Sequence, residues 1–217
     1  DCCFCIGTIN CRACWKIQVK KSALQIDAIV LAAGNSLRFG ADKRLFLVDG
    51  VPMLQSAIAA IIDAVNSVSV VLKSSDRDAL PLLLGDFFTD KRVIPLFLDK
   101  PEAGMGSNLA QAVANLPAAC DGVLVMLADM PYVQSQTVQA VIYAYEAEKI
   151  VAPVFWGENG VEQQGHPVLF SSQFFPELAQ LSGDNGARSV LRQHASAVIS
   201  LPVSDAGILR DIDTPLI

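Results

Sequence analysis

The stretch from Ile29 to Lys43, which reads IVLAAGNSLRFGADK, constrains the fold of this chain more than any other part of the sequence. The residues from Asp27 to Ala33 form a short apolar run with β-branched side chains, and such a run predicts a buried strand. The run stops at Gly34, where a glycine opens a loop. The sequence therefore predicts a buried first strand that leads directly into a loop.

This loop carries groups that suit a polyanionic ligand. It contains a hydroxyl, a guanidinium, a second glycine and an ammonium group, at Ser36, Arg38, Gly40 and Lys43. Glycines let backbone N–H groups approach phosphate oxygens, arginine can grip two oxygens as a fork, and lysine supplies a point charge. The spacing matches neither the dinucleotide fingerprint G-x-G-x-x-G nor the P-loop G-x-x-x-x-G-K-[ST]. We therefore expect a phosphate-binding loop of another kind.

The pattern L-A-A-G-x-S-x-R-x-G-x-x-K in this stretch resembles the signature of the MobA-like nucleotidyltransferases. The LAAG form, with Ala33, resembles the branch of molybdenum cofactor cytidylyltransferases, whereas guanylyl-transferring relatives usually carry LAGG. The resemblance implies that Arg38, Lys43 and Asp129 are catalytic. The residues that it places at the nucleotide are Leu31, Ala32, Ala33, Gly34, Ser36, Arg38, Lys43, Ser107 and Asn108.

Length and charge limit the classes of protein that this chain can belong to. Its 217 residues are enough for one sizeable domain, and 52% hydrophobic with 18% charged residues is a globular composition. A net charge of −6 argues against a nucleic-acid partner, because such affinity comes mostly from clustered Lys and Arg. No run approaches the roughly 18 apolar residues of a membrane span. A basic loop in an acidic chain points instead to a small anionic ligand.

The segment 1–25 differs from the rest of the chain because it holds most of the cysteines. Its two C-x-x-C pairs can supply four thiolates for zinc or a cluster, but five residues separate them, fewer than the usual gap of about 15 to 20. We predict a poorly ordered extension over 1–25, with a metal site as the alternative, and the transferase domain over 26–217. The segment lacks the basic start of a signal peptide, and unpaired cysteines indicate the cytoplasm. Its cysteines are Cys2, Cys3, Cys5, Cys11 and Cys14.

Strands and helices are predicted to alternate along the chain. Predicted strands cover 67–73, 93–98, 122–128, 150–155, 168–170 and 197–203, and predicted helices cover 51–66, 76–84 with an interruption near Pro81, and 133–148. This alternation predicts an α/β fold, a three-layer α/β/α Rossmann-like domain with a mostly parallel sheet. The resemblance implies the related fold of the nucleotide-diphospho-sugar transferases.

A further helix is predicted after the glycines at 104 and 106. Either Ser107 or Asn108 is expected to cap it, since both side chains accept hydrogen bonds from helix N–H groups. Free N–H groups at a helix start suit a base edge or an anion. The resemblance places the nucleotide base near this turn.

Two carboxylates are candidates for binding Mg²⁺. Asp129 follows the apolar run 122–128, and a carboxylate at the end of a central strand lies where open α/β sheets bind ligands. Mg²⁺ prefers one or two carboxylates together with phosphate oxygens. The LADMP sequence around Asp129 resembles the family, which implies Asp213 as the second ligand. Asp211, two residues earlier, remains the alternative.

Two later segments resemble the acceptor side of the family, GHPVLF from Gly165 and GDNGAR from Gly183. His166 either shapes a turn or contacts the substrate. Arg188 either contacts an anionic acceptor or pairs with a carboxylate. Asp184 or Asn185 is predicted to cap the helix that carries Arg188.

The resemblance implies that Mg²⁺ assists transfer of CMP from CTP to the phosphate of a pterin-type molybdenum cofactor, with release of pyrophosphate. The methyl group of Ala33 takes space that glycine would leave, which favours a pyrimidine over guanine. Three alternatives remain: a sugar or alcohol phosphate as acceptor, a chaperone that delivers cofactor to a molybdoenzyme apoprotein, and a nicotinamide-dependent oxidoreductase. The last lacks its G-x-G-x-x-G motif, and the charged residues Arg38, Lys43, Asp129 and Asp213 argue against an inactive chaperone.

Overall fold

The computed structural model describes residues 24–34, 42–98, 104–157 and 160–213. The predicted cysteine-rich extension therefore lies outside the described residues, apart from its last two positions. Ser36, Arg38 and Gly40 of the predicted phosphate loop also lie outside them.

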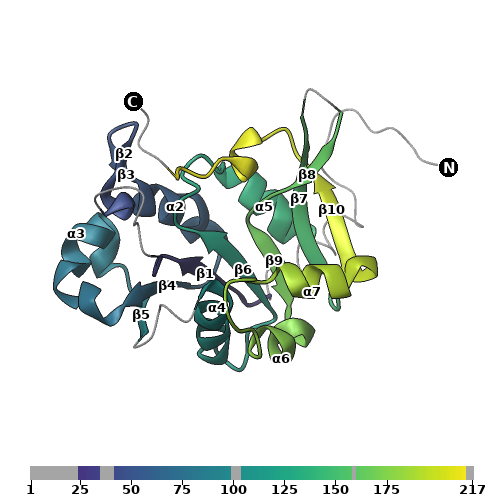
Figure 1. Ribbon diagram of the computed structural model, residues 1–217, viewed down its shortest axis with the longest axis horizontal. Helices are drawn as coiled ribbons and strands as arrows, with labels where there is room; N and C mark the ends of the chain where they lie inside the picture. Colours follow the sequence, from purple (N-terminus) through teal and green to yellow (C-terminus); the bar gives the residue numbers. More distant parts are fainter. Residues whose placement is uncertain (1–23, 35–41, 99–103, 158–159, 214–217) are drawn as a thin grey trace, which may run out of the picture.

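The described residues form an eight-stranded, mostly parallel sheet (Figure 1). Its order is β10-β7-β9-β6-β1-β4-β5, and β8 pairs with β7. The antiparallel pairs involve β8 and β9, and all other neighbours run parallel. The bounds are β1 Ile26–Leu31, β4 Val68–Lys73, β5 Val93–Leu98, β6 Gly122–Leu127, β7 Ile150–Trp156, β8 Glu162–Gln164, β9 Val168–Ser171 and β10 Val198–Pro202.

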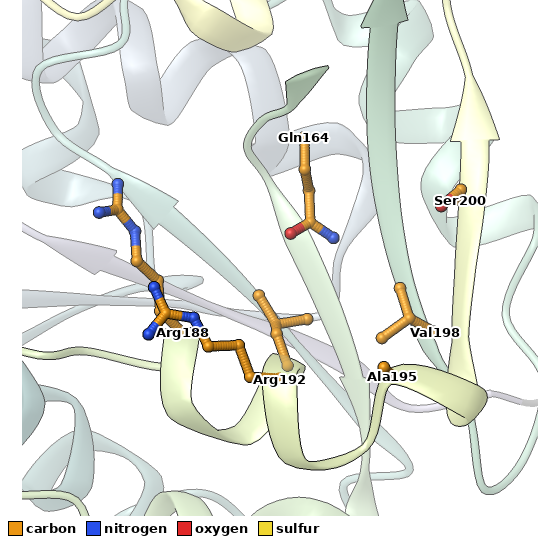
Figure 2. A pocket seen from close by; sticks show the side chains of 7 residues that line it. Gln164, Arg188, Arg192, Ala195, Val198 and Ser200 are labelled. Atoms are coloured by element: carbon orange, nitrogen blue, oxygen red, sulfur yellow. The ribbon is translucent and has the colours of Figure 1, made fainter. Parts of the chain in front are cut away.

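Helices cover both faces of this sheet, which confirms the three predicted layers. Successive strand residues point to opposite faces, so Val30 packs with α2 and α5 while Ile29 packs with α4 and α6. Helix α7 lies on the same face as α4 and α6, and Figure 2 shows it leading into β10. No helix within the described ranges is long and apolar enough to cross a membrane. The helices are α2 Met53–Ile61, α3 Leu80–Leu84, α4 Met105–Ala114, α5 Ser135–Tyr143, α6 Phe175–Leu178 and α7 Arg188–Gln193.

Several predicted helix boundaries are wrong. The helix predicted over 51–66 begins only at Met53, because the preceding residues form the small hairpin of β2 (Leu47–Val48) and β3 (Val51–Pro52). The helix predicted over 76–84 is divided into a 3-10 segment, Ser74–Ala79, and α3. This division between Ala79 and Leu80 agrees with the interruption predicted near Pro81, and Pro81 itself lies in the first turn of α3, where the missing N–H group is not needed. The helix predicted over 133–148 is the shorter α5.

The predicted caps of two helices are also wrong. Gly104, at a φ of 102°, precedes α4, and Ser107 and Asn108 both lie inside the helix. A Cβ atom at Gly104 would lie 2.5 Å from backbone atoms of Gly183, so only glycine allows this close approach. In α7 the capping position is Ala187, and no side chain caps the helix, so neither Asp184 nor Asn185 has the predicted role.

The strand register brings distant segments to one edge of the sheet. Leu31 at the end of β1 lies opposite Leu127 at the end of β6, so the loop after β1 and Asp129 leave the sheet together. We call this edge, where β1, β4 and β6 end, the carboxyl edge. Because β9 runs antiparallel to β6, with Val168 opposite Val125, it is the beginning of β9 that lies near this edge. His166, two residues before β9, therefore arrives there as well.

Asp205 ties the carboxyl-terminal segment to α5. Its buried carboxylate accepts hydrogen bonds from the Gln134 N–H group at 2.9 Å, the Thr137 hydroxyl at 2.7 Å and the Gly207 N–H group at 2.9 Å. The first two groups lie at the start of α5, where helix donors lack partners. The third lies in the 3-10 turn Ala206–Leu209, which leads toward Asp211 and Asp213. One carboxylate therefore holds the acidic segment against the domain.

We expect Asp205→Ala to lower the free energy of unfolding by about 3 kcal/mol, because it leaves buried donors without their acceptor. Asp78→Ala, which removes an exposed carboxylate, is the matched control and should change it by less than about 0.5 kcal/mol. Urea denaturation followed by circular dichroism measures both values. Equal midpoints for the two variants would contradict this role of Asp205.

Candidate active site

The predicted lysine and both predicted metal ligands meet at the carboxyl edge. The Lys43 Nζ atom lies 2.7 Å from Asp129 Oδ2 and 3.3 Å from Asp213 Oδ1. The backbone supports this meeting, because the Ile212 N–H group donates to the Asp129 carbonyl oxygen at 3.0 Å. Lys43 begins a 3-10 turn, Lys43–Leu45, Asp129 follows β6, and Asp213 lies near the chain end. Three segments distant in sequence thus converge on one group of charges.

Asp211 belongs to the same cluster as the two predicted ligands. One carboxylate oxygen from each of Asp129, Asp211 and Asp213 lies within 4.8 Å of the others. The Oδ1 atom of Asp129 is buried and has no hydrogen-bond partner among the described residues. A buried acceptor without a partner is unfavourable by about 1–3 kcal/mol, and a bound cation would satisfy it. The three carboxylates therefore fit a divalent cation that prefers oxygen ligands.

Lys43 shares these oxygens with any such cation. Burial by itself lowers the pKa of Lys43, but the hydrogen bond and charge of Asp129, followed by those of Asp213, outweigh it and raise the pKa above its usual value. Lys43 is therefore charged at neutral pH. A divalent cation bound at these carboxylates would compete with the ammonium group of Lys43 for their oxygens.

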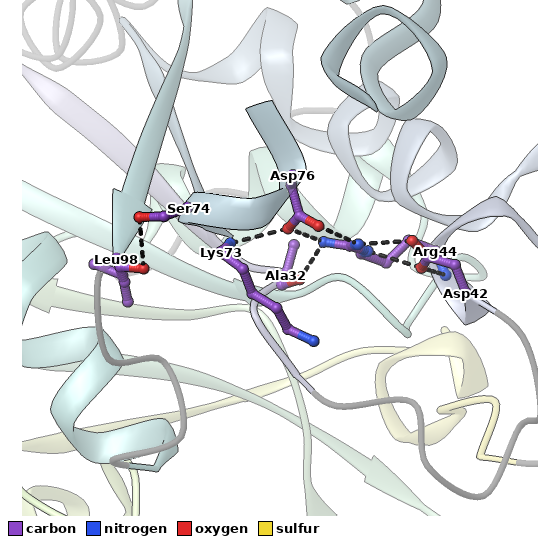
Figure 3. Close-up of polar contacts among 7 residues, drawn as sticks. All are labelled: Ala32, Asp42, Arg44, Lys73, Ser74, Asp76 and Leu98. Carbon is purple, nitrogen blue, oxygen red and sulfur yellow. Dashed lines mark hydrogen bonds and ion pairs between the residues drawn. The ribbon is translucent and has the colours of Figure 1, made fainter. Parts of the chain in front are cut away.

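Arg44, which sequence reasoning missed, anchors the lysine-bearing turn (Figure 3). Its buried guanidinium donates to Asp42 at 2.6 and 2.8 Å and to Asp76 at 2.6 and 2.9 Å. A further bond of 3.2 Å reaches the Ala32 carbonyl oxygen, just past the end of β1. Because Lys43 immediately precedes Arg44, this network restricts where the lysine can lie.

Asp76 extends the network to the neighbouring strand. Its carboxylate accepts a hydrogen bond from the backbone N–H group of Lys73, the last residue of β4, at 2.9 Å (Figure 3). Arg44 thus connects the lysine-bearing turn with the ends of two adjacent strands. The sequence does hold a signal for this role, because Asp76 follows a predicted strand just as Asp129 does.

The network remains ionised. Burial alone raises the pKa values of Asp42 and Asp76, but hydrogen bonds and charge from Arg44 outweigh it and lower both below their usual range. The same carboxylates raise the pKa of Arg44 despite its burial. One buried cation is therefore matched by two anions.

The first residues of the predicted nucleotide loop are mostly buried where they leave β1. Ala32 and Ala33 are each 3% exposed, and Leu31 is half-buried. Ala33 belongs to the same apolar cluster as Leu109 of α4, so its methyl group lies in the core beneath that helix. A Cβ atom at Gly34 would meet no other atom within 4 Å, so packing within the described chain does not require this glycine.

The turn at the start of α4, where the nucleotide base is predicted to bind, is hydrogen-bonded to Gly183 of the predicted acceptor segment. The Gly106 N–H group donates to the Gly183 carbonyl oxygen at 2.7 Å, and the Ser107 hydroxyl accepts from the Gly183 N–H group at 3.2 Å. Asn108 is buried on α4, with 7% of its surface exposed. Ser107 is therefore directed toward the segment that precedes Arg188.

The charges of both Asp129 and Arg188 act on the imidazole of His166. The backbone N–H group of His166 donates to the Ile208 carbonyl oxygen at 3.0 Å, and the ring Nδ1 lies 3.4 Å from the Val125 carbonyl oxygen. Burial lowers the pKa of His166, and the charge of Arg188 acts in the same direction, while the Val125 carbonyl and Asp129 oppose them. A neutral imidazole with its hydrogen on Nδ1 leaves Nε2 as an acceptor. Shaping the turn and contacting a substrate are both compatible with this position.

Known proteins resemble this chain over most of its length. The sequence model described as MobA-like NTP transferase domain matches residues 28–198. The purine catabolism protein PucB of Bacillus subtilis is 28% identical over 196 residues, which cover 86% of this chain and 91% of PucB. A probable molybdenum cofactor guanylyltransferase from Nostoc sp. is 26% identical over 195 residues, covering 88% of this chain and 87% of that protein.

Solved structures have folds similar to that of this chain. The crystal structure of Rv0371c from Mycobacterium tuberculosis aligns with a TM-score of 0.75 and 26% identity, covering 88% of this chain and 94% of that one. The complex of Rv0371c with manganese aligns with a TM-score of 0.68 at 24% identity, over 83% of this chain and 89% of that one. At that identity the second alignment shows the fold alone.

The Arg44 network predicts a pH-dependent contribution to stability. We expect Asp76→Asn to lower the free energy of unfolding by about 3 kcal/mol at pH 7, because it leaves a buried guanidinium poorly paired. The folded pKa of Asp76 lies below the unfolded value of about 3.9, so its contribution is complete above that pH and is lost as the pH falls further. Urea denaturation from pH 7 to pH 3 should show the gap between wild type and variant closing at the acidic end. Asp86→Asn, at an exposed site, should show no such gap.

Competition between Lys43 and a cation is tested by metal binding. Lys43→Met should raise the Mn²⁺ affinity of the nucleotide-free protein about tenfold or more, because a nearby positive charge is removed. Asp129→Asn should lower that affinity by a similar factor, and Lys91→Met, at an exposed lysine, should leave it unchanged. Titration followed by electron paramagnetic resonance measures free Mn²⁺. Weaker binding in Lys43→Met would contradict shared oxygens.

Proposed function

The chain belongs to the MobA-like NTP transferase family, and on this premise we propose that it transfers CMP from CTP to the phosphate of a molybdopterin-type cofactor, with Mg²⁺ as its metal. The observation that supports catalysis most directly is the convergence of Lys43 with Asp129 and Asp213 beside the loop that follows β1. Cationic and acidic groups around one nucleotide are what phosphoryl-group chemistry requires.

The proposed reaction exchanges one bond to phosphorus for another. An oxygen of the acceptor phosphate bonds to the α-phosphorus of CTP, and the bond from that phosphorus to the bridging oxygen of the β-phosphate breaks. The acceptor oxygen is already anionic, so no general base has to remove a proton. Negative charge grows on the departing pyrophosphate, where Lys43 and, from the motif, Arg38 would stabilise it.

The solved complex of Rv0371c with manganese is a structure of this fold with a divalent metal, which is in keeping with a metal at the acidic cluster. In this chain Asp129, Asp211 and Asp213 would hold the ion, which when bound supplies positive charge to the triphosphate. The unpartnered Oδ1 atom of Asp129 supports its assignment as a ligand. With the carboxylate oxygens so engaged, Lys43 would be available to donate to a phosphate oxygen. Arg44 and Asp76 hold the turn that carries it.

We expect Ala33 to favour CTP because its methyl group takes up space beside α4. This methyl group is buried in the cluster that includes Leu109 of α4, the helix whose first turn is proposed to face the base, and it takes space that glycine would leave. GTP is the second candidate, because the Nostoc relative is named a guanylyltransferase. That relative's name also supports a molybdenum cofactor as acceptor. His166 and Arg188 are the proposed acceptor contacts, and we further propose a cytoplasmic enzyme with a molybdoenzyme apoprotein as recipient.

Pyrophosphate release tests the proposal. With Mg²⁺, we expect CTP and molybdopterin-type cofactor to react faster than any pair containing GTP or a sugar phosphate. Asp129→Ala should reduce turnover about 100-fold or more, because charge neutralisation is lost, while its denaturation midpoint stays close to that of the wild type. Asp86→Ala, an exposed control, should react normally.

The outcomes separate the competing functions. Faster release with GTP would reassign the nucleotide, and faster release with a sugar phosphate would reassign the acceptor. Binding of molybdopterin without pyrophosphate release under any condition would favour a delivery chaperone. Normal turnover by Asp129→Ala would reject the proposed site.

A further inference from the structure

A recess of about 420 Å³ lies on the face of the sheet that carries α7 (Figure 2). It opens between α7, β8 and β10, outside the acidic cluster. We call it the arginine pocket. Its lining residues are Gln164, Arg188, Leu191, Arg192, Ala195, Val198 and Ser200.

The pocket holds two positive charges that the described protein does not neutralise. Arg188 and Arg192 are one helical turn apart on α7, and Figure 2 shows both side chains extending to the same side of the helix. Neither forms an ion pair or a hydrogen bond within the described part of the chain. Like charges at this spacing repel and weaken a helix. In a chain with a net charge of −6, an arginine pair that no described carboxylate neutralises is an arrangement that an anion would stabilise.

The other polar groups of the pocket can also donate hydrogen bonds. The Gln164 side chain points from β8 toward α7 in Figure 2, and its amide carries two N–H donors. Ser200 adds a hydroxyl from β10, and no carboxylate lines the pocket. Arginine binds phosphate or carboxylate through two parallel hydrogen bonds. The lining therefore suits an oxyanion and disfavours a cation.

The pocket lies next to the residues proposed to contact the acceptor, since Arg188 is one of its lining residues. Gln164 is separated from His166 by a single residue, and His166 experiences the charges of both Asp129 and Arg188. The segment before Arg188 is held to the start of α4 by the hydrogen bonds of Gly183. None of the lining residues belongs to the acidic cluster, so an anion in the pocket would be distinct from the phosphate that attacks CTP.

We propose that the arginine pocket binds a second oxyanion group of the acceptor, with Arg192, Gln164 and Ser200 joining Arg188 as contacts. The assignment to the acceptor rests on the proposed function, whereas oxyanion binding itself does not. Arg192 is thus a specificity residue. Acceptors that carry only the attacking phosphate would bind more weakly than acceptors with a second anionic group.

Binding of inorganic phosphate to the full chain tests the pocket without any turnover. In metal-free buffer, isothermal titration calorimetry should show that Arg192→Gln weakens phosphate binding about tenfold or more, and that Gln164→Leu weakens it less. Arg92→Gln removes the same charge from an arginine whose ion pairs, with Asp63 and Asp90, lie at the β5 end of the sheet, and should change nothing. Saturating CTP should not displace the phosphate.

Three results would overturn oxyanion binding in the pocket: equal phosphate affinity in wild type and Arg192→Gln, no binding at millimolar concentration, or displacement by CTP. Inhibition of pyrophosphate release distinguishes the source of the anion. Phosphate inhibition that competes with the acceptor and disappears in Arg192→Gln supports an acceptor subsite, and non-competitive inhibition would assign the pocket to a separate effector. Failure of the proposed function would appear differently, as absent pyrophosphate release with the Arg192-dependent phosphate binding intact.

Discussion

The parallel pairing of β1 with β6 decides where the charges of this protein meet. Because Leu31 and Leu127 are opposite each other, the loop after β1 and Asp129 emerge at the same edge. Both strands are almost wholly apolar and buried on two faces, so their register is determined by packing and not by the charged groups beyond them. The candidate active site therefore depends on the core. Burial of apolar side chains stabilises the pairing of β1 with β6, and this pairing brings the oppositely charged residues close together.

Arg44 and Lys43 have different surroundings at this edge, and these surroundings suit them to different roles. Arg44 is buried between two carboxylates and a carbonyl oxygen, an arrangement that suits a fixed support. Lys43 is more exposed and contacts carboxylates that a metal ion can also use, an arrangement that suits a cation able to change partners. Arginine forms rigid, forked contacts, and lysine is a flexible point charge. Neighbouring residues in sequence thus serve as anchor and as movable cation.

The antiparallel strand β9 connects the carboxyl edge with the region of the arginine pocket. It lies between β6 and β7 and runs against both, so the turn before it returns to the carboxyl edge with His166. The same turn follows β8, whose last residue lines the arginine pocket. The contacts between Gly183 and the start of α4 make a second connection. The segments proposed to bind the nucleotide and the acceptor are therefore packed against each other.

Local patterns in the sequence determined the strands, most helices, the layered fold and the family. They also singled out Lys43 and Asp129, because a charged residue in the loop after a buried strand is visible without coordinates, whereas Asp213 was indicated by the resemblance to the family. Local patterns did not predict where the helices begin. The start of α4 is marked by Gly104, which lies against Gly183, about 80 residues away, and no side chain caps the helix. Arg44 with Asp76, the meeting of Asp211 with Asp213 and Asp129, and the arginine pocket depend on which strands lie side by side and in which direction. That information is decided by tertiary packing, because contacts between residues distant in the chain leave no periodic signal in the sequence.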